Sequence, residues 1–480
     1  MSAIKKNIIL NGINTVSGII FPIITFPYAA RVLMPDGIGA VNFLNSIIGY
    51  IVMLTSLGIP MYAVKEVAKC RDNVALRNHV TVEIILLSSL LCLAGYVAVW
   101  LLATFVPEIN QQAALFYVLS LSIVFNAIGV NWFYQAVEDF KFITIRAIVI
   151  RTLAALCLFL FVHDADDLLI YGFITVGSTV GNNIINFVHL RRHIPLSTIA
   201  FRKLEIWRHL SPAFQVFILN LIISLYIQLN SVMLGFMSGD DAVGYFTAGT
   251  KMSHIGLTMI GSIGTVLLPR CANLLKSGDT EGFRTVIHKS LRLTLGLSLP
   301  VTAGLMLLAA PVTYVFCGED YTAAIPVLLL NAPVVVFISL TNIMGIQILY
   351  PMDKINIVIW SVTGGAVANL LFNLVFIPMW GATGAALSTL IAEFTVLVVQ
   401  IVMGRRYYPF AVRELFQGHY LLATVIMSAA VLAVTIPVDD NWLKLAVGIP
   451  AGLITYYISL YLMRDSLIMD LHSIKILKKR

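Results

Sequence analysis

The chain has 480 residues, of which 59% are hydrophobic and only 11% are charged, and its formal net charge is +7. A soluble protein carries about a quarter charged residues, so this composition excludes an ordinary soluble domain. Apolar runs recur from end to end, and each is long enough for a helix to cross the hydrocarbon core, which needs about 20 residues. They lack the alternation of polar and apolar residues that transmembrane β-strands show. The expected fold class is therefore all-α, a polytopic membrane protein.

Taken in chain order, the apolar runs predict about fourteen transmembrane helices joined by short loops, with no soluble domain attached. The stretch before the first run, MSAIKK, is too short and too sparsely basic for a cleaved signal, so the first run is expected to be a span. The predicted spans are 8–30, 38–62, 81–105, 113–135, 143–162, 168–189, 211–236, 243–268, 293–316, 323–349, 355–377, 382–403, 419–437 and 443–463.

Lysine and arginine set the predicted orientation, because the cytoplasmic loops of membrane proteins are enriched in them. With a cytoplasmic N-terminus, the even-numbered connections and the two termini collect 27 of the 31 lysines and arginines. The other face carries acidic pairs, such as Asp240 with Asp241 and Asp439 with Asp440. The sequence therefore predicts a multi-pass protein with both termini in the cytoplasm. Its positive net charge reflects this topology and does not indicate a nucleic-acid partner.

No pattern of residues points to a cofactor, a metal centre or an enzyme active site. The five cysteines are scattered without a CxxC pair, and no HExxH, Walker A or GxSxG pattern occurs. A catalytic function therefore has no support in the sequence, and the expectation is a protein that is not an enzyme and holds no cofactor or metal.

A short motif recurs along the chain. Asp36-Gly37-Ile38-Gly39 aligns with Asp241-Ala242-Val243-Gly244 at an offset of 205 residues, and each motif follows one predicted span and opens the next. Six spans separate the two copies, which predicts a parallel repeat of two six-helix lobes. For Asp36 and Asp241 we expect a structural role as helix caps, and for Gly39 and Gly244 a role in the turn. The predicted lobes are 1–205 and 206–410, followed by two extra helices and a cytoplasmic tail in 411–480.

The first hairpin, YAARVLMPDGIG from Tyr28 to Gly39, resembles that of bacterial polysaccharide transporters. These are the Wzx-type flippases of the multidrug/oligosaccharidyl-lipid/polysaccharide (MOP) exporter superfamily. Further matches are VGYF at 243–246 with Lys251, and WGATGAA at 380–386 with Glu393. The resemblance covers the whole chain in length, span number and two-lobed layout. It implies that a lipid-linked oligosaccharide moves by alternating access from the inner to the outer leaflet of the bacterial inner membrane. The partners it implies are this substrate, membrane lipids, and the polysaccharide polymerase and chain-length machinery.

A polyprenyl diphosphate carrying sugars needs a hydrated, cationic path across the membrane. Charges inside spans are costly, about 2.5–3.5 kcal/mol at the membrane centre, and usually face a cavity or a partner. The candidates within the predicted spans are Arg31, Arg151, Lys251 and Glu393. We expect the three cations to bind substrate, and Lys251 is the strongest candidate. The structural alternatives are that Arg31 reaches the outer interface or pairs with Asp36, and that Arg151 reaches the cytoplasmic interface beside Arg146.

The remaining candidate residues are polar side chains within spans. Asn42 and Asn369 are expected to contact sugar hydroxyls, although such amides more often hydrogen-bond between helices. Glu393 and His254 are candidates for ion coupling, and His254 lies one turn beyond Lys251 on the same helix face. A charge that crosses 100 mV releases about 2.3 kcal/mol, enough to bias a transport cycle. Whether the coupling ion is a proton or sodium stays open.

Several alternatives share these features. A multidrug or cation antiporter of the same superfamily would favour buried acids, in which the predicted spans are poor, and would have twelve spans. A lipid II flippase shares fourteen spans and basic cavities. A different class, a membrane-embedded polyprenyl-sugar transferase or a non-transporting scaffold, fits less well, because a transferase needs acidic motifs in larger loops than this chain provides.

Overall fold

The computed structural model describes residues 3–194, 204–415, 417–465 and 469, and these described residues contain helices but no β-strand. They divide into two compact units, Met1–Gly244 and Tyr245–Arg480. The predicted lobes, 1–205 and 206–410, stay a prediction.

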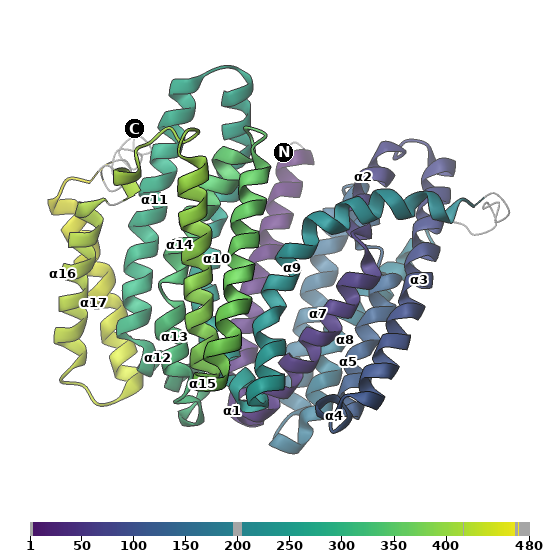
Figure 1. Ribbon diagram of the computed structural model, residues 1–480, viewed down its shortest axis with the longest axis horizontal. Helices are drawn as coiled ribbons and strands as arrows, with labels where there is room; N and C mark the ends of the chain where they lie inside the picture. The colour runs from purple at the N-terminus through teal and green to yellow at the C-terminus, as the bar shows by residue number, and fades with distance from the viewer. Residues whose placement is uncertain (1–2, 195–203, 416, 466–468, 470–480) are drawn as a thin grey trace. The chain divides into compact units, whose positions relative to one another are not determined.

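Among its described residues, the first unit holds nine α-helices and the start of a tenth, which continues into the second unit (Figure 1). They are α1 (Ala3–Ser56), α2 (Ile59–Lys69), α3 (Val74–Phe105), α4 (Pro107–Asn110), α5 (Ala113–Ala127), α6 (Asn131–Ala136), α7 (Phe140–Phe161), α8 (Leu168–Leu190), α9 (Leu210–Ser238) and α10 (Asp240–Lys276), with short 3-10 turns η1 (Ala165–Asp167) and η4 (Ile206–His209).

After α10, the second unit contains long helices and, between α11 and α15, a series of short ones. They are α11 (Thr280–Leu307), α12 (Ala309–Cys317), η5 (Glu319–Tyr321), α13 (Ala324–Asn331), α14 (Val334–Asn342), the π-helix η6 (Ile343–Leu349), α15 (Ile355–Gly404), η7 (Val412–Leu415), α16 (Gly418–Thr435) and α17 (Asn441–Leu462).

Ten helical segments among the described residues are long and apolar enough to cross a membrane, and the predicted fold class is confirmed. Helix α1 runs through the first two predicted spans and α15 through the eleventh and twelfth, each with a kink, at Met34 (φ 59°, ψ 176°) and at Gly381 (φ 52°, ψ −126°). Met34 precedes Pro35, and proline disfavours the helical conformation in the residue before it. Helices α9 and α10 cover the seventh and eighth predicted spans without being among the ten, so the number fourteen stays a prediction.

Side chains at the helix starts explain where several helices begin. Asn73 accepts a hydrogen bond from the third residue of α3, and Asp139, Asp279 and Asp440 do the same for α7, α11 and α17. Each such cap satisfies a backbone amide that the helix leaves without a partner, and is worth about 1 kcal/mol.

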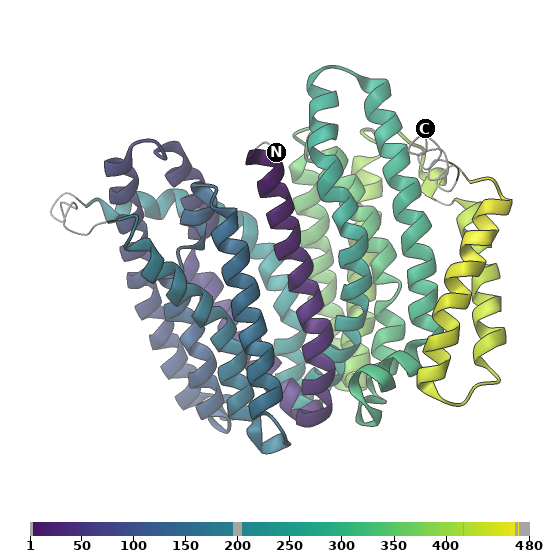
Figure 2. The same ribbon diagram turned by 180° about the vertical axis from the view of Figure 1, so that it is seen from behind.

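Within the first unit, α3, α5, α7 and α8 run side by side, and α1 packs against α5, α7 and α9 (Figure 1). Its core at one end is aromatic, with Phe133 and Tyr134 of α6 fully buried. Within the second unit, α16 and α17 form a hairpin that packs on α11 (Figure 2). The hydroxyl of Tyr456 in α17 donates to the carbonyl oxygen of Gly296 in α11 at 2.7 Å, which ties the hairpin to the unit.

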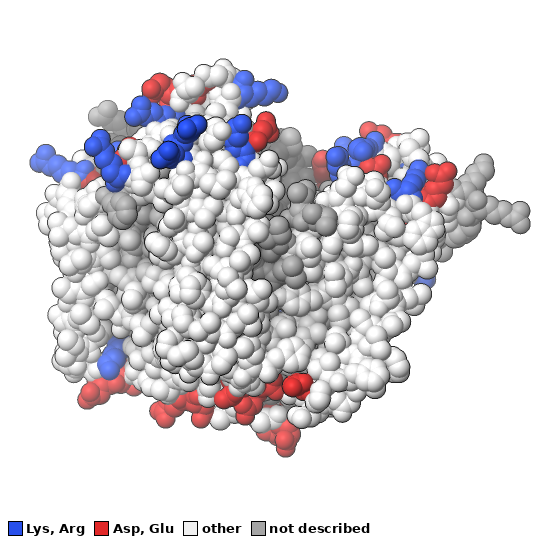
Figure 3. Space-filling model, in the orientation of Figure 1, with Lys and Arg blue, Asp and Glu red and all other residues white. Residues whose placement is uncertain are grey.

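On the face shown in Figure 3, most charged side chains lie toward two opposite edges, and a broad uncharged band separates them. Large apolar side chains are exposed on this band, for example Leu93 and Val97 of α3 and Leu453 of α17. Such a surface suits lipid, and the chain is a multi-pass membrane protein. Two parts of the predicted basic set, 202–203 and the terminal KILKKR, lie outside the described residues.

Candidate functional site

The two glycines of the repeated motif lie where the turn after the first predicted span meets the turn after the seventh. A Cβ atom built on Gly39 would overlap the carbonyl oxygen of Asp240 and lie 2.9 Å from the amide nitrogen of Gly244. A Cβ atom on Gly244 would overlap the carbonyl oxygen of Pro35. Glycine permits this approach of two backbones because it has no side chain.

The acids beside these glycines have different surroundings. Asp36 is exposed, and Asp241 accepts a 2.8 Å hydrogen bond from the amide of Ala242 at the start of α10. Asp240 accepts a hydrogen bond from the side-chain amide of Gln112, directly before α5. Sequence analysis did not single out this pair, which joins the start of α10 to the start of α5. The capping role of Asp36 stays a prediction.

Arg151 holds α7 to the first half of α1. Its Nη1 group donates to the backbone oxygen of Asn14 at 3.0 Å, to the side-chain oxygen of Asn14 at 3.1 Å and to the hydroxyl of Ser17. The guanidinium packs on Gly18, where a Cβ atom would lie 3.5 Å from Nη2. Arg151 therefore contacts another helix, and its Nε and Nη2 groups donate to none of the described residues.

Arg146 lies one and a half turns before Arg151 in α7 and is buried, only 8% exposed. Its Nε donates to the side-chain oxygen of Asn182 at 2.9 Å and its Nη2 to that of Asn131 at 3.1 Å, while Phe142 lies beneath the guanidinium. Its Nη1 is buried and has no hydrogen-bond partner in the described part of the chain. Sequence analysis counted Arg146 among the basic loops, although it falls inside the predicted span 143–162. The structure places it within the first unit as a further buried cation.

Glu83 is the second residue that sequence analysis missed. Its carboxylate, with no exposed surface, accepts hydrogen bonds from the amide of Glu205 at 2.6 Å, from Nε2 of His209 at 2.9 Å and from Arg208. His79 approaches the same carboxylate at 3.3 Å. We name these residues the Glu83 cluster; it joins α3 to η4, directly before α9. An acid inside the predicted span 81–105 was the signal that could have identified it.

Within the cluster, His209 meets a different residue at each ring nitrogen. Its Nε2 lies 2.9 Å from the carboxylate of Glu83, and its Nδ1 lies 2.7 Å from the hydroxyl of Tyr62. His209 is 2% exposed, so this chain from Tyr62 to Glu83 is closed to solvent along its length.

The remaining first-unit candidates have simpler surroundings. The side chain of Arg31 is exposed, shortly before the kink of α1. Asn42 is half-buried, and its side-chain amide donates to the carbonyl oxygen of Ile38 on its own helix at 2.7 Å.

In the second unit, Lys251 is half-buried and His254 is exposed, both on α10. Glu393, in the second half of α15, is 7% exposed. Asn369, in the first half of α15, is fully buried and accepts a 3.1 Å hydrogen bond from the side chain of Asn373. Its own Nδ2 has no hydrogen-bond partner among the described residues. The candidates are thus divided between the two units, and a path that they share stays a prediction.

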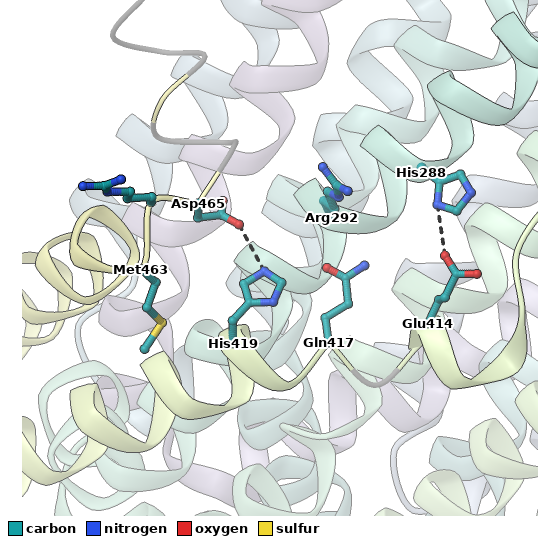
Figure 4. A pocket seen from close by; sticks show the side chains of 8 residues that line it. His288, Arg292, Glu414, Gln417, His419, Met463 and Asp465 are labelled. Atoms are coloured by element: carbon teal, nitrogen blue, oxygen red, sulfur yellow. Dashed lines mark ion pairs between the residues drawn. The ribbon is translucent and has the colours of Figure 1, made fainter.

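A cavity of about 460 Å³ opens in the second unit where the start of α16 and the end of α17 meet the first half of α11 (Figure 4). The polar side chains that line it come from three separate segments: His288 and Arg292; Glu414, Gln417 and His419; Arg464 and Asp465. Two ion pairs cross the wall, His288 with Glu414 at 3.3 Å and His419 with Asp465 at 3.1 Å. From the sequence, Arg292 and Arg464 were counted only as topology signals and the other residues were not singled out, because the three segments are far apart in the chain.

Comparison with known sequences finds two relationships. Residues 4–275 match the family described as "Polysaccharide biosynthesis protein". A protein of Escherichia coli strain K12 named "Putative O-antigen transporter" is 26% identical over 347 residues, which cover 72% of this chain and 83% of that protein.

Comparison with solved structures finds the same architecture in transporters. The lipid II flippase MurJ in an inward closed conformation has a TM-score of 0.73 at 15% identity, covering 96% of this chain and 100% of that one. An inward-facing multidrug resistance MATE family transporter of the MOP superfamily has a TM-score of 0.63 at 15% identity, covering 83% and 97%. At these identities the similarity concerns the fold, and the chain has the fold of MOP-superfamily transporters.

Proposed function

This chain belongs to the family of polysaccharide biosynthesis proteins, and from that membership we propose that it moves a polyprenyl-diphosphate-linked oligosaccharide repeat unit across the bacterial inner membrane. The direction is from the cytoplasmic to the outer leaflet, and both termini are cytoplasmic. The observation that carries the proposal is the family match over more than half of the chain, together with the O-antigen transporter relative. The transporter fold supports it.

The proposed substrate presents a chemical problem that the charged residues can solve. Its diphosphate and sugars are polar and need donors along the way, while its polyprenyl tail remains in lipid. Arg31, Arg151 and Lys251 supply cations at different places along their helices, and the buried Arg146 adds one more with an unused donor. The guanidinium group of arginine can donate two parallel hydrogen bonds to phosphate oxygens. The affinity of these cations for the headgroup has to stay modest, so that the headgroup can leave on the outer side.

We propose further that the cycle runs by alternating access and is coupled to an ion. A buried carboxylate such as Glu393 is the kind of group that binds a proton or sodium ion within a span. His254 is the second candidate, and its exposed side chain makes it the weaker one. The polysaccharide polymerase and chain-length machinery are the proposed protein partners, since they act on the same unit after it has crossed.

The test is export in a strain that lacks this gene and carries variants on a plasmid. Lys251→Ala should strongly reduce surface polysaccharide, and Lys251→Arg should retain part of it, because a cation is restored. Lys276→Ala is the matched control, since Lys276 is exposed at the end of the same helix and should leave export unchanged. Immunoblots of the membrane fraction verify that protein level and insertion are equal.

One result contradicts the cationic path outright. If the Lys251→Ala, Arg151→Ala double variant exports polysaccharide at the wild-type level, these cations do not carry the headgroup.

Two further assays distinguish a lipid II flippase and a drug antiporter from the proposed polysaccharide transporter. Rescue of a strain depleted of its lipid II flippase, or drug resistance without polysaccharide export, would replace the proposed substrate.

A further inference from the structure

We propose that the cavity between α11, α16 and α17 binds the zwitterionic phosphoethanolamine headgroup of a membrane phospholipid, on the basic side of the protein. The cavity, about 460 Å³, lies wholly within the second unit. The inference concerns a resident lipid and does not rest on the proposed transport function.

The cavity has the donors that a phosphate needs. Arg292 of α11 and Arg464, directly after α17, both line it and carry permanent positive charges. Helix α16 begins at Gly418, and the side chain of Gln417 before it makes no capping hydrogen bond. The start of an 18-residue helix therefore adds its dipole to the two arginines.

The same wall has the acceptors that an ammonium group needs. Glu414 and Asp465 line the cavity, and each is held in place by a histidine, His288 and His419 respectively (Figure 4). The side-chain oxygen of Gln417 is buried and accepts no hydrogen bond from the described residues. A buried acceptor without a donor is uncommon, and an ammonium N–H would satisfy it.

The balance of charge selects among headgroups. The arginines Arg292 and Arg464 bring two positive charges to the wall, and the carboxylates of Glu414 and Asp465 bring two negative ones. A headgroup with one phosphate and one ammonium matches this balance. A purely anionic headgroup would face two carboxylates without a countercharge of its own. The diphosphate of the proposed transport substrate, with more negative charge still, is a poorer match.

The surface beside the cavity suits the acyl chains. Leu422 and Val425 of α16 are 53% and 64% exposed, and Leu462, at the end of α17, is 74% exposed. These apolar side chains follow directly from the cavity along the two helices. A lipid can therefore place its headgroup in the cavity and its chains on α16 and α17, whereas a soluble phosphate compound gains nothing from this surface.

The experiment is native mass spectrometry of the full-length protein, delipidated in detergent and titrated with phosphatidylethanolamine or phosphatidylglycerol. We expect one high-affinity phosphatidylethanolamine per chain and weaker binding of phosphatidylglycerol. Arg464→Gln should weaken phosphatidylethanolamine binding about tenfold or more, the amount that a charge-assisted hydrogen bond supports. Arg406→Gln, at an exposed basic residue outside the cavity, should not change it.

A second variant tests the role of charge balance in the choice of lipid. Glu414→Gln removes one negative charge from the wall, so it should reverse the lipid preference toward phosphatidylglycerol. Thermal unfolding of each variant shows whether the fold is intact. The proposal is wrong if phosphatidylglycerol binds the wild type as tightly as phosphatidylethanolamine, or if Arg464→Gln and Glu414→Gln both bind as the wild type does. Displacement of the lipid by an equal concentration of free phosphoethanolamine would assign the site to a soluble ligand and also contradict it.

Discussion

The Glu83 cluster should contribute strongly to the free energy of unfolding of the first unit. The Glu83 carboxylate has no exposed surface and receives three hydrogen bonds, one of them from His209, which is itself 2% exposed. Glu83→Ala removes both carboxylate oxygens and leaves the amide of Glu205 and Nε2 of His209 without this acceptor. Each buried donor left without an acceptor costs about 1–3 kcal/mol, so the two together should cost about 2–6 kcal/mol. Glu83→Gln preserves the shape and one acceptor, so we expect a loss of about 1–3 kcal/mol.

The assay is equilibrium unfolding in mixed detergent micelles, followed by tryptophan fluorescence and circular dichroism. The matched control is Glu66→Ala, which removes a partly exposed acid that pairs with Lys69 at 2.8 Å, three residues along α2. Exposed pairs of this kind contribute about 0–1 kcal/mol. If Glu83→Ala and Glu66→Ala destabilise the protein equally, the Glu83 cluster does not hold α3 to the start of α9. Arg208→Gln leaves the buried Glu83 carboxylate without the arginine that pairs with it, so it should also destabilise the protein, by about 1–3 kcal/mol.

Two further predictions concern stability. Gly39→Ala and Gly244→Ala should each destabilise the protein by about 2–3 kcal/mol in the same unfolding assay, because the added methyl group meets backbone that cannot rotate away. The control is Gly304→Ala, where a Cβ atom meets nothing within 4 Å and which should be neutral or slightly stabilising. An equal loss of stability at Gly304 would contradict the prediction. Burial lowers the pKa of His193, which follows α8, and the neighbouring His189 lowers it further. The unfolded chain then takes up a proton at higher pH than the folded one, so stability should be complete above about pH 6.5 and fall as the pH decreases below it. His193→Gln should flatten this part of the pH profile, and an unchanged slope would rule out His193 as its source.

Much of the architecture could be predicted because the features that direct a segment into the membrane are local features of its sequence. A run of apolar residues predicts a span wherever it occurs, and the charge at its ends predicts orientation from a few neighbouring residues. The repeat of Asp36 to Gly39 at Asp241 to Gly244 was equally visible, since it needs only an alignment of the chain with itself. Two pairs of predicted spans fall within α1 and α15, where a non-helical residue, Met34 or Gly381, separates the two halves; the backbone angles at these residues could not be predicted from hydropathy.

The sequence by itself determined the class of protein, the apolar band, and the family resemblance that its motifs carry. Only the tertiary structure decided which polar residues meet. Glu83 and His209 lie 126 residues apart in sequence, and the cavity at Gln417 draws on three distant segments. From the sequence, Arg146 was counted with the basic loops, but in the fold it is buried and donates a hydrogen bond to the side chain of Asn182. The physical reason is that a hydrogen bond or an ion pair depends on which helix faces pack together, and that choice is made by the whole set of interhelical contacts, whereas hydropathy is a property of each segment alone.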